Sequence, residues 1–199
     1  MLVKSFGAAV QGINATIITI EVNLSQGIKF FLVGLPDNAV KESHERIVSS
    51  MQFNGYKFPK FQLVINMAPA DIRKEGSAYD LPLAIGIMAA AGQINTGVLK
   101  DFIIMGELSL DGSLQPIKGI LPIAIKAREE GFKGFILPAQ NAREAAVVNN
   151  LDVYGVNTIK EVVEFLNGEK ELLKTTINTR EEFFLNMDSF DLDFEDVKG

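Results

Sequence analysis

The chain has no cysteine, no tryptophan and a single histidine among its 199 residues. Without cysteine, disulfide scaffolds, thiolate zinc sites and cysteine nucleophiles are excluded, and one histidine excludes a histidine-rich metal centre. No apolar run approaches the roughly 18 residues that a membrane span needs. The first five residues lack the apolar core of a signal peptide, so we expect a cytoplasmic protein without a membrane partner.

Apolar residues make up 47% of the chain, which is enough for a sizeable core. The formal net charge of −6 argues against nonspecific nucleic-acid binding by the whole surface. Residues 169–199 alone carry a net charge of −5, so residues 1–168 are close to neutral. We therefore predict a folded domain over 1–168 and an acidic linker over 169–199 that docks on something else. A disordered tail remains the alternative for the second part.

Residues 1–168 alternate β-branched segments with segments of helical periodicity. Strands are expected at 15–22, 28–33, 61–67, 103–110, 135–138 and 153–156. Helices are expected after Asp37, from Asp80, over 120–130 and 141–149, and after Thr158. The turn at Ser25–Gly27 predicts a hairpin between the first two strands. This order predicts an α+β fold, an α/β sandwich in which helices pack on a mixed sheet through right-handed βαβ units.

Local residue patterns account for most polar side chains at the predicted helix ends. Asp37 and Asp80 are each expected to cap the helix that follows, and Thr158 with Glu161 forms a capping box. The lone His44 lies on the apolar stripe of its helix, so a partly buried structural role is favoured over catalysis. Capping and solvation explain the carboxylates Asp80 and Glu75, although a paired acid–base site with Glu107 stays open.

The sequence contains neither of the two common nucleotide-binding fingerprints. There is no G-x-x-x-x-G-K-[ST], so no lysine and hydroxyl hold phosphates and Mg²⁺, and there is no G-x-G-x-x-G. We expect no ATP hydrolysis, no cofactor and no metal in this chain.

Bases and aromatic residues are interleaved over Tyr56–Phe61. Such mixtures bind single-stranded nucleic acid by stacking and charge neutralisation. The speculative nucleic-acid-binding residues are Lys57, Lys60, Arg73 and Lys74. The alternative is an ordinary loop whose aromatics pack on the core while its lysines face water.

Three segments resemble the proteolytic domain of Lon proteases, namely 74–80, 106–120 and 132–138. In that alignment the nucleophilic serine falls on Ala78 and the general-base lysine falls on Leu121. The resemblance therefore implies a Lon-protease-domain-like fold without catalytic residues, because hydrocarbon side chains neither attack a carbonyl nor take a proton. Residual hydrolysis stays open as an alternative. It would use Ser77, which adjoins Ala78, and Lys118, which lies just before Leu121 in the sequence.

A closer resemblance covers nearly the whole chain. Five motifs in the same order resemble the N-terminal domain of the magnesium-chelatase-like AAA+ ATPases, and they lie at 34–43, 66–71, 74–76 with 79–82, 106–108 and 193–199.

This family resemblance implies a non-catalytic regulatory or assembly domain that precedes a C-terminal ATPase module. ATP and magnesium are expected in that module, and its ring neighbours are the expected partners. The full-length form is expected to remodel DNA by helicase-like branch migration, with direct DNA contact by this domain left open.

Overall fold

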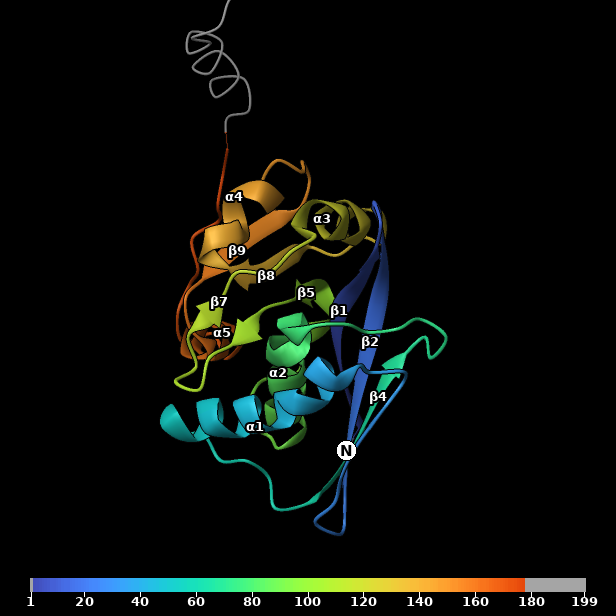
Figure 1. The fold of residues 1–199 in the computed structure, drawn as a ribbon. Coiled ribbons are helices and arrows are strands. Elements are labelled where there is room, and N and C mark those ends of the chain that lie inside the picture. The colour runs from blue at the N-terminus through green and yellow to red at the C-terminus, as the bar shows by residue number, and fades with distance from the viewer. Residues whose placement is uncertain (1, 178–199) are drawn as a thin grey trace, which may run out of the picture.

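The computed structural model describes residues 2–177 (Figure 1). Its larger sheet has four strands. Their spatial order is β1–β2–β4–β3. The bounds are Leu2–Gln11 for β1, Asn14–Ser25 for β2, Phe30–Val33 for β3 and Gln62–Ala68 for β4. β1, β2 and β4 pair antiparallel, whereas β3 pairs parallel with β4, and α1 (Asn38–Phe53) connects those two. The sheet is therefore mixed, as predicted.

A second, fully parallel sheet is built from the later part of the chain. Its order is β5–β8–β9, with bounds Phe102–Ile104, Gly134–Pro138 and Asp152–Val156. The helices of this half are α3 (Ile120–Glu129), α4 (Ala142–Ala145) and α5 (Ile159–Leu166). A short ribbon, β6 (Glu107–Leu108) with β7 (Leu114–Gln115), completes it. The fold class is α+β as predicted, but the strands form two sheets and a ribbon.

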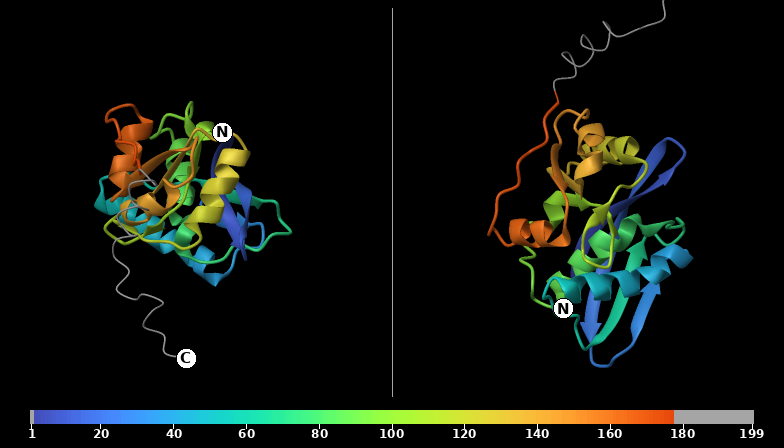
Figure 2. Two further views of the ribbon diagram at one scale, coloured as in Figure 1. Left: turned by 90° about the horizontal axis from the view of Figure 1, so that it is seen from above. Right: turned by 60° about the vertical axis from the view of Figure 1, so that its left-hand side comes forward.

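Helix α2 (Asp80–Ala90) forms the centre of the domain, and all of its residues are buried. It contacts α1, β1 and β2, and the views in Figure 2 show it enclosed by these elements. The sequence predicts this placement because its residues are apolar on every side of the helix. At about 25 cal/mol per Å² of apolar surface, such a helix contributes strongly to stability.

Strand β1 was not predicted, and its residues show why. Ser5, Gly7, Ala8 and Ala9 have weak strand preference. The packing favours the absence of a side chain at Gly7, because a Cβ there would lie 2.9 Å from the sulfur of Met105. Long-range packing therefore decides the structure of this segment.

The predicted hairpin at Ser25–Gly27 is wrong. β4 lies between β2 and β3, so the two strands that flank this turn do not pair with each other. The parallel pairing of β3 with β4 depends on the helix between them, which a local turn signal does not reveal.

Other local predictions are confirmed. Asp37 caps α1 by accepting a hydrogen bond from the Val40 amide at 2.8 Å, and Thr158 accepts from the Glu161 amide at 3.3 Å. The His44 ring packs between aromatic rings, with its centroid 4.6 Å from that of Phe30. His44 is therefore a structural residue of the α1 face.

Of the segment 169–199, predicted as an acidic linker, the structure describes only the first part. Residues 169–177 run without helix or strand beside the parallel sheet, where Thr175 donates to the Val153 carbonyl at 2.8 Å. Residues 178–199, including the motif at 193–199, lie outside the described residues. Within residues 2–177, no helix combines the length and apolar character that crossing a membrane requires.

Candidate functional site

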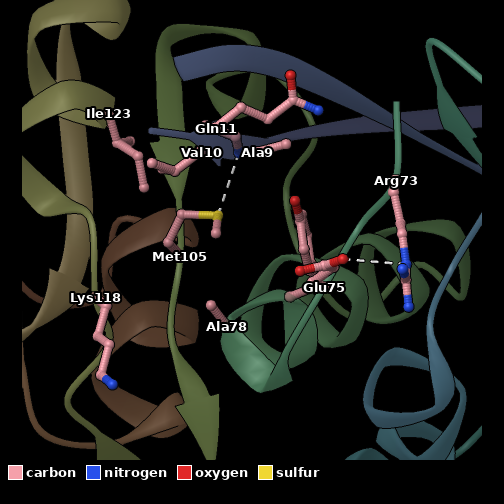
Figure 3. A pocket seen from close by; sticks show the side chains of 11 residues that line it. Ala9, Val10, Gln11, Arg73, Glu75, Ala78, Met105, Lys118 and Ile123 are labelled. Carbon is pink, nitrogen blue, oxygen red and sulfur yellow. Dashed lines mark hydrogen bonds and ion pairs between the residues drawn. The ribbon is translucent and has the colours of Figure 1, made fainter. Parts of the chain in front are cut away.

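A cleft of about 430 Å³ lies between the outer edge of β1 and the start of α2. Figure 3 shows Lys118 and Ile123 on one side, Arg73 and Glu75 on the other, and Ala78 with Met105 between them. The 3-10 turn Ser77–Tyr79 brings Ala78 to this position. The loop before α2 therefore forms one wall of the cleft, through Arg73, Glu75 and Ala78.

An adjoining pocket of about 520 Å³ continues past the same turn. It shares Glu75, Ala78 and Lys118 with the first cleft and adds Ser77 and Glu107. The two pockets thus form one polar trench on either side of Ala78.

The two positions matched to the Lon dyad do not both face this trench. Ala78 lines both pockets, whereas Leu121 lines neither and lies in the first turn of α3, 39% exposed. The Leu121 amide donates to the Glu144 carboxylate at 3.3 Å. Neither side chain offers a nucleophile or a base.

Ser77 is the hydroxyl nearest in sequence to the missing nucleophile. It donates a hydrogen bond to the Glu107 carboxylate. Lys118 lines the same pocket, but among residues 2–177 no hydrogen bond joins the two side chains. The structure brings a hydroxyl and an amine into one pocket without pairing them as nucleophile and base.

The interpretation of Asp80 as a helix cap is wrong. Asp80 is the first residue of α2, and its fully buried carboxylate pairs with Arg46, at 2.6 Å from Nε to Oδ2 and 2.9 Å from Nη2 to Oδ1. The Leu108 amide also donates to it at 3.2 Å. Burial raises the pKa of Asp80, and the hydrogen bonds from Arg46 and Leu108 oppose that rise.

Arg46 is a structural residue that the sequence reasoning missed. On α1 it falls among exposed charged residues, so helical periodicity places it on the solvent face. Its partner is 34 residues away, and only the meeting of α1 with α2 reveals the pair. The Asp80 carboxylate raises the pKa of Arg46, so the guanidinium stays charged.

The four cations proposed for nucleic acid do not share one surface. Lys74 is fully buried and donates to the Pro69 carbonyl, and burial lowers the pKa of Lys74. Its inclusion as a surface residue is therefore wrong. Arg73 lines the trench and pairs with Glu75 at 3.1 Å. Only Lys57 and Lys60 lie together, both exposed, beside a different groove.

Asp37 connects helix α1 to the trench. One of its carboxylate oxygens caps Val40, and the other accepts from the Gly76 amide at 3.1 Å. We expect Asp37→Ala to lower the free energy of unfolding by about 1–2 kcal/mol, because a cap and a loop bond are lost together. Urea unfolding measures this effect, and Asp37→Asn, which keeps one acceptor, should lose less. An unchanged midpoint would contradict the assignment.

The trench offers no ready metal site. Among residues 2–177, no group of three or more histidine, aspartate and glutamate side chains has the geometry to hold an ion. The open alternative of a paired acid–base site is not favoured either, because Asp80 is occupied by Arg46 and Glu75 is tied to Arg73.

Comparison with known proteins agrees with these features. The sequence model of the family described as "Subunit ChlI of Mg-chelatase" matches residues 20–141. The competence protein ComM of Haemophilus influenzae is 39% identical over 195 residues, which cover 98% of this chain and 38% of ComM. The protein YifB of Escherichia coli is 37% identical over 165 residues, covering 82% of this chain and 32% of YifB.

A more distant similarity agrees with the resemblance to peptidases. Lon protease 2 of Bacillus subtilis is 27% identical over 125 residues, covering 62% of this chain and 22% of that protein. The chain spans about two fifths of the length of ComM and less of the other relatives. Because the family model matches more than half of the sequence, the chain belongs to the magnesium-chelatase-like family represented by the ChlI subunit.

Proposed function

We propose that this chain is a non-catalytic N-terminal domain that regulates or assembles a magnesium-chelatase-like AAA+ ATPase. The observation that carries the proposal is the polar trench, in which the Lon nucleophile position holds Ala78 and the base position, Leu121, lies outside. A trench that lacks a nucleophile and a general base at these positions can bind a partner but has no groups for peptide hydrolysis.

The rest of the proposal concerns the longer protein. ATP and magnesium would bind in a C-terminal module outside this chain, and the domain would contact that module and neighbouring subunits of a ring. The similarity to a competence protein supports ATP-driven remodelling of DNA, such as branch migration, as the activity of the whole. The family membership supports the ATPase module, and the similarity to ComM, a competence protein, supports a role connected with competence.

A turnover experiment tests the non-catalytic role. The 199-residue chain should hydrolyse neither ATP nor an unfolded protein substrate such as casein, because it has no phosphate cradle and no paired nucleophile. Adding the ATPase module in the same polypeptide should give ATP hydrolysis and nucleotide-dependent oligomers. Hydrolysis of ATP by the 199-residue chain would overturn the proposal.

The hydrolase alternative needs its own control. A fluorophosphonate probe should label the chain no more strongly than Ser77→Ala, because the Ser77 hydroxyl is bonded to Glu107 rather than to a nitrogen base. Labelling that Ser77→Ala abolishes would instead favour a residual serine hydrolase.

A nucleic-acid-binding module built from Lys57, Lys60, Arg73 and Lys74 is not carried forward as a second function. The burial of Lys74 and the separate position of Arg73 leave only two of its four cations on one surface.

A further inference from the structure

Two apolar grooves flank the loop that joins α1 to β4. One, of about 370 Å³, lies against Ile28, and the other, of about 650 Å³, reaches Tyr56. Both are lined by Phe58, Pro59, Lys60 and Phe61. We call the exposed residues of this region the basic-aromatic surface, defined as Ile28, Lys29, Lys57, Lys60 and Phe61.

The basic-aromatic surface exposes large apolar side chains beside lysines. Ile28 is 90% exposed and Phe61 is 55% exposed. Ile28 and Phe61 line the same groove, and exposed apolar patches rimmed by polar residues mark interaction sites. Among residues 2–177, Lys29, Lys57 and Lys60 make no ion pair, so their charge is available to a partner.

This surface is held in place before any partner binds. The backbone of Lys57 is clamped to Gln93, which accepts from the Lys57 amide at 3.0 Å and donates to its carbonyl at 2.8 Å. The Phe58 ring packs edge-on against His44, with centroids 5.4 Å apart. A preformed surface loses little conformational entropy on binding.

The surroundings favour an apolar acidic segment over a nucleic acid strand. Glu45 lies beside His44, and Glu164 and Glu169 lie close enough to Tyr56 to raise its pKa further, after burial. A strand with a phosphate at every nucleotide would meet these carboxylates as well as the three lysines. A short segment with few acidic side chains meets less repulsion from these carboxylates than such a strand does, and its large apolar side chains match the two grooves.

We propose that residues 180–190 of a second copy of this chain dock on the basic-aromatic surface. This segment carries Arg180 with Glu181, Glu182 and Asp188, so its acids exceed its bases, and Phe183, Phe184 and Leu185 form a run of large apolar side chains. Its phenyl rings would enter the two grooves while its carboxylates pair with Lys57 and Lys60. The inference deepens the proposed assembly role and rests on it.

The reach of the chain favours a second copy over the same molecule. The described chain ends at residue 177, at the end of the domain opposite the loop before β4 in Figures 1 and 2. Six residues from there to Phe183 span at most about 20 Å. A domain of this size is about 40 Å across, so intramolecular docking would require the segment to cross most of the molecule.

Docking of this kind joins different patches on the two partners. Such a heterologous contact repeats from copy to copy and gives a closed ring or an open chain. This geometry agrees with the ring that the proposed function needs.

Sedimentation of the 199-residue chain over a concentration series tests the proposal. The chain should self-associate, and Lys57→Glu with Lys60→Glu should weaken that association about tenfold. Glu181→Lys with Glu182→Lys should weaken it similarly. Lys41→Glu with Lys100→Glu, which makes the same charge change at exposed sites elsewhere, should have little effect.

A mixture of the two weakened variants gives the sharpest outcome. Each then offers the other a complementary surface and segment, so the mixture should regain the association that neither shows alone. A chain that stays monomeric at every concentration, or a mixture that stays weak, would overturn the proposal.

Nucleic acid is the competing occupant. If oligo-dT binds the wild-type chain, and Lys57→Glu with Lys60→Glu abolishes that binding while Glu181→Lys with Glu182→Lys leaves self-association unchanged, the surface serves DNA and the proposal is overturned. Nucleotide-dependent oligomers of the longer protein would leave the proposed function standing in that case.

Discussion

Arg46→Ala should lower the free energy of unfolding by about 3–5 kcal/mol, because it leaves the buried Asp80 carboxylate without its cation. Of the donors to Asp80 found within residues 2–177, only the Leu108 amide would then remain. The Arg46–Asp80 ion pair also connects α1 to α2, so its loss should weaken the packing of α1 on the central helix. Urea unfolding followed by far-UV circular dichroism measures the effect.

The double variant Arg46→Ala with Asp80→Asn separates two contributions to the lost stability. These are the unpaired charge on Asp80 and the lost packing of the Arg46 side chain. Removing the uncompensated charge should recover part of the stability, because a neutral amide costs less to bury than a carboxylate. If Arg46→Ala alone cost less than about 1 kcal/mol, as an exposed ion pair does, the assignment of a buried pair would be contradicted.

The difference in the free energy of unfolding between the wild type and Arg46→Ala should depend on pH. Burial raises the pKa of Asp80, and removal of Arg46 removes a hydrogen bond that opposes the rise. A carboxyl whose pKa is higher in the folded state stabilises the fold at low pH and loses that contribution as the pH rises through the folded-state value. The variant should therefore lie closer to the wild type at about pH 5 than at pH 7. A larger deficit at the lower pH would contradict this.

Gly34→Ala should cost about 3 kcal/mol or more, because the position combines a strained backbone with a close approach of two strands. Gly34 has φ of +104°, and a Cβ there would lie 2.2 Å from the carbonyl oxygen of Met67. No side-chain rotation relieves contact with backbone, so β3 would have to move away from β4. Thermal and urea unfolding measure the loss.

Gly12→Ala is the matched control for this substitution. Gly12 also has a positive φ, +63°, but a Cβ there would meet no atom within 4 Å. Gly12→Ala should lower the free energy of unfolding by only about 1–2 kcal/mol, which is the penalty for an L-residue in a left-handed backbone conformation. If the two substitutions lowered the free energy of unfolding equally, the close approach of residue 34 to Met67 would contribute nothing to the loss.

The features that the sequence predicted correctly depend on neighbouring residues. The Asp37 cap, the Thr158 capping box and the buried character of α2 each follow from a few consecutive positions.

The features that the sequence did not predict depend on distant partners. Asp80 resembles a helix cap until Arg46 and Leu108 meet it from other elements. Lys74 resembles a surface cation, but the preceding loop folds over it and Pro69 accepts its hydrogen bond. Periodicity and charge patterns carry no information on these contacts between distant residues. The contacts are decided only when whole helices and strands pack together.

The position of β1 affects how the chain folds during synthesis. Among the described strands β1 is made first, and it is the outermost strand of its sheet, yet it lies along β5, where the Ala8 amide meets the Met105 sulfur at 3.3 Å. Roughly 100 residues separate the two, and a ribosome needs about 5–20 s to add them. During that interval the nascent β1–β2 hairpin has an uncovered edge strand, so it is the part of this domain that is most open to wrong pairing during synthesis.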